Sequence, residues 1–251
     1  MSYMWSRSNI AFFYALAFSL LLLPTTAHSD DVALRIFAVH FPPYEFEAPE
    51  EGLKGFDVEV VEALFLRLGK PVKIEFMPWT RAVKTVFDGQ AMALLSCARR
   101  AEREPYVYFS SPISLATTGY FQRIEDLDPG YQTLEGLRGQ KVVAVRGYST
   151  QESLTELSIE HLAVRSNKLA LNILSSARAD YLYGYKEGNQ FIAKQLGLSD
   201  KLRFHPLSSE NYHLCFSKFW PQAEALLEAF NQQLKQLKSD GSYDAIHDKY
   251  R

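Results

Sequence analysis

The residues of this chain that could do chemistry are mainly groups that bind anions. Arginines gather in one charged run, Arg99, Arg100, Glu102, Arg103 and Glu104. A guanidinium offers planar, paired donors that match a carboxylate, which an ammonium does not. Taken alone, such a run is more often a solvated surface, so the run by itself leaves both interpretations open.

A second group of donors follows Gly147, where Ser149 and Thr150 begin an expected helix. Their hydroxyls and the free backbone N–H groups of a helix start can hold an anion. The alternative is ordinary N-capping of the helix. Both roles are compatible with each other.

Signals of catalysis or of metal binding are missing from the sequence. There is no Gly-x-Ser-x-Gly elbow and no glycine-rich phosphate loop, and the two cysteines and six histidines are scattered without metal-ligand spacing. The formal net charge of −2 argues against a nucleic-acid partner. We therefore expect no metal, no cofactor and no nucleic acid.

Cys97 and Cys215 are the only cysteines, and each lies in an apolar stretch. An oxidising compartment would permit a disulfide between them. Two buried free thiols are the favoured interpretation, because free cysteine is commonly buried as a small apolar residue.

The N-terminus has the pattern of a secretory signal peptide. Arg7 precedes a largely apolar run from Ile10 to Leu23, and small residues at Ala27 and Ser29 suit a cleavage site. The run is shorter than the ~20 residues that a membrane-spanning helix needs. We expect residues 1–29 to be removed and the mature chain to be secreted into the periplasm.

Apolar periodicity in the rest of the chain predicts strands alternating with helices, in two successive sets. The expected strands are 33–39, 72–76, 93–95, 142–145, 161–164 and 181–185. The expected helices are 56–67, 81–88, 150–157, 169–177, 189–196 and 225–237. Such alternation is typical of parallel sheets covered by helices on both faces.

Two extended segments, 115–121 and 212–216, separate the two sets and predict two crossings between two lobes. Residues 30–113 with 213–251 would form lobe 1, and residues 114–212 would form lobe 2. The C-terminal helix is assigned to lobe 1 because it must pack on a lobe that is already built. The expected fold class is α/β, each lobe being a mostly parallel sheet flanked by helices, with two hinge crossings.

Several motifs follow one another through nearly all of the mature chain. They are Pro42-Pro43-Tyr44-Glu45-Phe46, Gly55-Phe56-Asp57-Val58-Glu59, Pro78-Trp79, Glu102-Arg103 with Phe109-Ser110-Ser111-Pro112, Leu137-Arg138-Gly139, Val145-Arg146-Gly147, Ala177-Arg178-Ala179-Asp180 and Asp240-Gly241-Ser242-Tyr243. No single motif is specific. Their joint order resembles the bacterial extracellular solute-binding proteins of family 3, which serve polar amino acid transporters.

The resemblance implies a set of ligand-contacting residues. Arg103 stands where the family places its carboxylate-binding arginine, and Tyr44 and Trp79 stand where it presents aromatic faces, although both could instead be core aromatics. Arg81 could line the same cleft or cap the helix surface. The full set is Tyr44, Trp79, Arg81, Ser96, Arg103, Ser149, Thr150 and Tyr185.

Three departures from the family pattern concern specificity. Tyr185 stands where family members carry the acid that pairs with a ligand ammonium. Met92 replaces a usual aspartate, and the segment that follows it is one residue shorter. Ser96 is therefore only an approximate match to the family's ligand-contacting residue. Arg100 replaces a threonine. The fold therefore carries over from the family, whereas the specificity does not.

The missing acid leaves two expectations. Glu187 could supply the negative charge if the segment after Tyr185 turns inward, although exposure to solvent is the usual state of such a residue. Otherwise the solute is not a simple α-amino acid, because a tyrosine cannot neutralise a buried cation. A carboxylate with an uncharged or aromatic remainder would then fit better.

The favoured function is the capture of a small polar, carboxylate-bearing solute by hinge closure in the periplasm. A membrane transporter or a sensor would receive the solute, and we expect the chain to be a monomer without enzymatic activity. The alternative is a periplasmic enzyme on the same scaffold, such as a dehydratase of cyclic carboxylates, with Glu45 or His40 as its acid or base.

Overall fold

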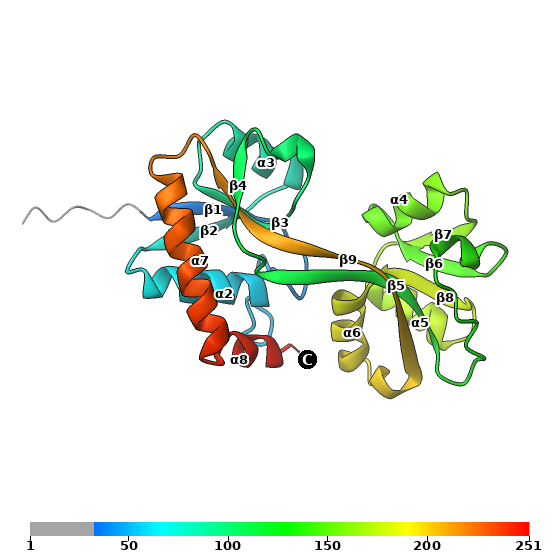
Figure 1. Ribbon diagram of the computed structural model, residues 1–251. Helices are drawn as coiled ribbons and strands as arrows, with labels where there is room; N and C mark the ends of the chain where they lie inside the picture. Colours follow the sequence, from blue (N-terminus) through cyan, green and yellow to red (C-terminus); the bar gives the residue numbers. More distant parts are fainter. Residues whose placement is uncertain (1–32, 251) are drawn as a thin grey trace, which may run out of the picture. The chain divides into compact units, whose positions relative to one another are not determined.

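The computed structural model describes residues 33–250, so the expected signal peptide lies outside the described residues. Strands and helices alternate along the chain (Figure 1). The strands are β1 (Leu34–Ala38), β2 (Val72–Phe76), β3 (Ala93–Ala98), β4 (Val107–Phe109), β5 (Ser114–Arg123), β6 (Val142–Val145), β7 (His161–Val164), β8 (Tyr181–Tyr185) and β9 (Leu202–Ser217). The α-helices are α2 (Phe56–Arg67), α3 (Trp79–Phe87), α4 (Ser149–Glu156), α5 (Asn167–Ser175), α6 (Lys186–Gln195), α7 (Ala223–Ser239) and α8 (Ser242–Asp248).

The strands hydrogen-bond in the order β2-β1-β3-β9-β5-β8-β6-β7, with β4 paired to β9 outside this path. Strand β1 is parallel to β2 and β3, and β6 is parallel to β7 and β8. The long strands β5 and β9 are antiparallel to each other and join the two parallel sets. The expected parallel sets are thus present. Their strands belong to one continuous sheet that contains both parallel and antiparallel pairs.

The first parallel set has its own apolar core. Helices α2 and α7 pack over it, with Leu64, Phe230 and Leu234 almost fully buried against Ile36 and Met92. Leu226, Phe230, Leu234 and Leu237 recur at helical spacing, which gives α7 one apolar face. Helix α7, which contains the predicted helix 225–237, therefore packs on the first set of strands, beside α2 (Figure 1).

The second parallel set is covered by α4, α5 and α6. Its largest core joins Val143 and Leu182 of the strands to Leu171 and Leu174 of α5. Ser166 caps α5 by accepting a hydrogen bond from the Leu169 N–H at 3.3 Å. Each parallel set thus packs around an apolar core of its own.

The crossing strands β5 and β9 run side by side over most of their length (Figure 1). Their register shifts between Thr118 and Gly119. A Cβ at Gly119 would lie 2.0 Å from the His205 carbonyl oxygen, so only glycine permits this close approach.

Most predicted elements end within a few residues of the observed ones, and β3 and β9 extend well beyond the predicted segments. Helix α6 begins at Lys186 rather than at residue 189. Among residues 33–250, no helix is both long and apolar enough to cross a bilayer. The division into lobes at residues 113 and 212 stays a prediction.

Cys97 and Cys215 form a disulfide, so the expectation of two free thiols was wrong. They lie on the antiparallel pair β3 and β9, where Leu94 faces Cys215 and Cys97 faces His213. The Cα atoms are 6.0 Å apart, within the range that a disulfide requires. This proximity depends on the pairing of two strands whose cysteines lie 118 residues apart in the sequence.

Candidate functional site

Arg103 differs from the other arginines of its charged run. Arg99 pairs with Glu104 at 3.0 Å and Arg100 pairs with Glu210 at 2.6 Å. Arg103 is partly buried and donates to the Ala98 carbonyl oxygen at 2.7 Å. Within residues 33–250, no carboxylate lies within 4.0 Å of its guanidinium. Burial and the nearby Arg100 lower the pKa of Arg103, and its charge is available to an anion.

Trp79 places its ring 5.2 Å from the guanidinium carbon of Arg103. This cation–π contact limits the orientations of the guanidinium. Trp79 begins α3 and is half-buried, whereas Arg81, two residues later, is exposed on the same helix. The structure thus brings Trp79 and Arg103 together and leaves Arg81 on the surface.

Ser96 occupies an irregular position in β3. The pairing of β3 with β9 shifts register between Leu94 and Cys97, and Ser96 has a φ of 45°. Such bulges redirect a side chain and are common beside functional sites. Ser96 is the one residue of β3 that is not buried, and its hydroxyl donates to Asp57 Oδ2 at 2.6 Å.

Asp57 and Glu45 form a buried acidic pair behind Ser96. Both are fully buried; Asp57 Oδ2 also accepts from the Ser114 hydroxyl at 2.9 Å, and Glu45 Oε2 accepts from the Val39 N–H at 2.7 Å. Burial raises the pKa of Glu45 to about 8 and that of Asp57 to about 7. Glu45 is therefore protonated at neutral pH and has no access to a solute, which removes it as a catalytic acid.

Tyr44 is fully buried, and its hydroxyl donates to the Leu115 carbonyl oxygen at 3.0 Å. A solute could not reach its ring unless the loop moved. Gly55 permits the chain to pass close to this loop, because a Cβ there would lie 2.3 Å from the Tyr44 carbonyl oxygen. Phe41 stacks on Tyr44 with ring centroids 4.9 Å apart and is itself only half-buried.

Tyr185 ends β8 and exchanges a 2.7 Å hydrogen bond with the hydroxyl of Ser149 at the start of α4. Ser149 is exposed and does not cap α4, whose N-cap residue is Tyr148. Thr150 is buried, and its hydroxyl oxygen has no hydrogen-bond partner in the described part of the chain. The structure thus brings Ser149 to Tyr185 and buries Thr150.

Aromatic rings connect the Arg103 side of the site to the Tyr185 side. Ala98, which binds Arg103, pairs with Tyr212 of β9. The ring of Phe41 lies 6.3 Å from that of Tyr212 and 5.4 Å from that of Tyr185. The predicted residues Trp79, Arg103, Ser149 and Tyr185 therefore belong to one continuous path of contacts.

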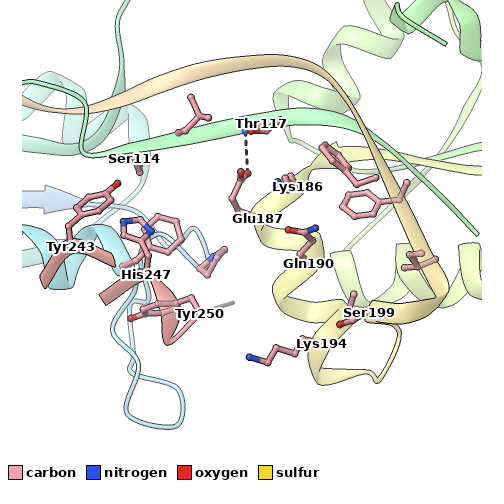
Figure 2. A pocket seen from close by; sticks show the side chains of 17 residues that line it. Ser114, Thr117, Lys186, Glu187, Gln190, Lys194, Ser199, Tyr243, His247 and Tyr250 are labelled. Atoms are coloured by element: carbon pink, nitrogen blue, oxygen red, sulfur yellow. Dashed lines mark hydrogen bonds between the residues drawn. The ribbon is translucent and has the colours of Figure 1, made fainter. Parts of the chain in front are cut away.

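A separate cavity of about 610 Å³ lies beside β5 and α6, and its lining includes none of the predicted ligand residues. Figure 2 shows the carboxylate of Glu187 turned toward β5, where it accepts from the Thr117 N–H at 3.2 Å. Glu187 is half-buried, contrary to the expectation of solvent exposure. Its negative charge also helps to raise the pKa of Tyr44, after burial.

Two residues that bear on the site were not identified from the sequence. Phe41 follows the carboxyl end of β1, the edge where solutes bind in open α/β sheets, and this position was a usable signal. Asp57 was noticed only as part of a motif, because its contact with Ser96 joins residues far apart in the sequence. Among residues 33–250, no group of His, Cys, Asp and Glu could hold a metal ion.

Curated relatives of the chain are amino acid-binding proteins. A probable histidine-binding protein of Campylobacter jejuni subsp. jejuni serotype O:2 is 26% identical over 85% of this chain and 82% of its own length. The ABC transporter glutamine-binding protein GlnH of Bacillus subtilis is 27% identical over 80% of this chain and 74% of its own length. Their names describe solute binding, not catalysis.

A solved structure with the same fold is an ancestral cationic amino acid solute-binding protein, at 24% identity and a TM-score of 0.72. The match covers 87% of this chain and 95% of the ancestral protein. The fold is thus the two-lobed α/β fold of periplasmic binding proteins. The sequence profile of the bacterial extracellular solute-binding proteins, family 3, matches residues 35–251. The chain belongs to this family of solute-binding proteins and is not an enzyme.

Proposed function

We propose that the chain captures a small, carboxylate-bearing solute, an amino acid or a related compound, between its two lobes. The observation that carries this proposal is the guanidinium of Arg103, which is partly buried, oriented by Trp79 and without a carboxylate partner in the described chain. Burying such a cation is unfavourable unless an anion completes the site. A carboxylate matches its paired donors.

The other side of the site would be formed by Ser149, Thr150 and Tyr185. Ser149 and Tyr185 already share a hydrogen bond, and free N–H groups at the start of α4 suit an anion. Phe41, rather than the buried Tyr44, would supply the aromatic face against the solute. Bending of β5 and β9 would let the two sides close on the solute.

The proposed location is the periplasm, with residues 1–29 acting as the signal peptide. An ABC transporter or a sensor would take over the solute, since one relative is named as an ABC transporter binding protein. We further propose that the mature chain acts as a monomer, without a cofactor.

A thermal-shift screen of residues 30–251 against amino acids, dicarboxylates and aromatic acids tests the proposal. A compound present at 100 times its Kd adds ~2.7 kcal/mol of stability. Failure of every carboxylate-bearing compound to stabilise the protein would overturn the proposed function.

Arg103→Ala should weaken a stabilising carboxylate by ~2 to 5 kcal/mol, because one partner of a charge-assisted pair is lost. Calorimetry on the variant measures the loss. Arg99→Ala is the matched control, since Arg99 is exposed and already paired with Glu104. Equal losses in both variants would show that Arg103 does not bind the carboxylate.

A further inference from the structure

The separate cavity beside β5 and α6 is large enough for a small molecule and has no part in the proposed solute site. Its volume of about 610 Å³ falls within the range of ligand pockets, about 300–1,000 Å³. None of the residues proposed to bind the solute lines it. Its lining comes from α2 and α8 on one side, from α6 and β9 on the other, and from β5 (Figure 2). An occupant of this cavity would therefore be distinct from the solute proposed above.

One wall of the cavity is aromatic, and its rings are held in place by the protein. Phe56 stacks on His247 with ring centroids 4.6 Å apart, and the ring of Tyr250 lies 5.6 Å from that of Phe56. The hydroxyl of Tyr243 donates to the Ile113 carbonyl oxygen at 2.7 Å, and that of Tyr250 accepts from the backbone N–H just before α2 at 2.8 Å. Because both hydroxyls are engaged within the protein, the two tyrosines offer mainly their ring surfaces to an occupant. Such a wall suits a flat, apolar body.

The opposite wall carries hydrogen-bond donors in a row along α6. Lys186, Gln190 and Lys194 recur every four residues, so they share one face of the helix and span ~12 Å. Figure 2 shows these three side chains on the side of the cavity opposite the rings of Tyr243 and Tyr250. Both lysines are cationic, so this wall attracts the negative end of an occupant.

The charges of the lining favour an anion. Besides the two lysines, the charged lining residue is Glu187, whose carboxylate is turned to β5 and accepts from the Thr117 N–H at 3.2 Å. Lys186 is half-buried, and no carboxylate of residues 33–250 lies within 4.0 Å of its ammonium. Its nitrogen lies 6.0 Å from the centroid of the Phe204 ring, at the limit of a cation–π contact. A half-buried cation without a counter-ion is stabilised when an anion binds beside it.

We propose that the separate cavity is a second binding site, which takes an aromatic anion. The ring system of the anion lies against the aromatic wall of Phe56, Tyr243 and Tyr250, and its carboxylate or sulfonate lies beside Lys186. The inference goes beyond the proposed function and does not rest on it, because Arg103 is absent from the lining. Since α8 packs on α2 and α7 whereas α6 packs on α5 and β8, an occupant would also bridge elements of the two parallel sets.

The first experiment titrates residues 30–251 with 8-anilinonaphthalene-1-sulfonate, an aromatic anion whose fluorescence increases in apolar sites. Its neutral counterpart is N-phenyl-1-naphthylamine, the same ring system without the sulfonate. The anion should saturate one site, and Lys186→Gln should weaken it about tenfold, because a charge-assisted contact is lost. The same variant should leave the neutral counterpart unaffected. Lys168→Gln is the matched control, since Lys168 is exposed on α5 and lies outside the lining.

Two further variants locate the bound anion. Gln190→Trp should abolish its binding, because the indole would occupy the space between α6 and α8, and the exposed position of Gln190 leaves the core intact. An anion that is lost in Arg103→Ala but kept in Lys186→Gln would lie in the proposed solute site, which overturns the inference. Equal weakening by Lys186→Gln and Lys168→Gln would show non-specific attraction to positive charge and would overturn it as well.

A smaller pair of probes repeats the test by calorimetry, with naphthalene-2-carboxylate as the anion and naphthalene-2-carboxamide as its neutral counterpart. The carboxylate should bind a site that depends on Lys186 and not on Arg103, and the carboxamide should be insensitive to Lys186→Gln. If neither anion binds in this way to the wild-type protein, the inference is refuted, whatever the fate of the proposed function. The proposed function fails separately, when no carboxylate-bearing compound depends on Arg103.

Discussion

At the scale of single residues, the buried pair Glu45 and Asp57 links the site to the stability of the protein. Burial raises the pKa of Glu45 from 4.5 to about 8 and that of Asp57 from 3.8 to about 7. Between these limits the folded chain binds more protons than the unfolded chain. Their contribution to stability is therefore fully present below about pH 4 and is lost as the pH rises to about 8.

Glu45→Gln should remove the proton that Glu45 takes up on folding. Between about pH 5.5 and pH 8, its stability relative to the wild-type protein should increase by up to ~1.4 kcal/mol per pH unit. Urea unfolding of both proteins at several pH values measures this difference. Comparing the two proteins cancels other groups such as His213, whose pKa is lowered by burial. A constant difference across the interval would mean that Glu45 is ionised in the folded protein.

At the scale of elements, β3 carries three neighbouring residues that bear on the candidate site. It places Ser96 at a register shift, and the next residue, Cys97, is bonded covalently to Cys215 of β9. The carbonyl of Ala98 then binds Arg103. The disulfide thus fixes the strand between Ser96 and Ala98.

Replacing both cysteines by serine should lower the free energy of unfolding by about 3–5 kcal/mol, since the bond closes a loop of more than a hundred residues in the unfolded chain. Thermal unfolding with and without a reducing agent measures the effect. The double variant should not respond to the reductant, which serves as the internal control. Equal stability of the reduced and oxidised wild-type protein would show that the disulfide does not form in solution.

At the scale of the whole molecule, β5 and β9 are the two strands that connect the parallel sets. If they act as the hinge, saturation with a stabilising carboxylate should reduce the radius of gyration, which small-angle X-ray scattering measures. Arg103→Ala at the same concentration should keep the larger value. A radius that stays the same while calorimetry reports saturation would argue against hinge closure.

The sequence by itself determined the elements, because these depend on local periodicity. The apolar spacing from Phe56 predicted α2 to its exact bounds, and the short apolar runs predicted β2, β6, β7 and β8 in the same way. The combination of motifs also predicted the family, which the match over residues 35–251 confirms. Helix α6 was placed too late, since its first residues, Lys186 to Gly188, contain no apolar signal.

The tertiary structure decided which residues meet, because contacts between distant segments leave no local pattern. Cys97 and Cys215 are joined only because β9 returns to pair with β3. The burial of Tyr44 and the partial exposure of its neighbour Phe41 could not be recognised from the sequence. Both depend on the close packing of Gly55 against the loop that carries them. The contact between Asp57 and Ser96 likewise requires α2 to pack against β3.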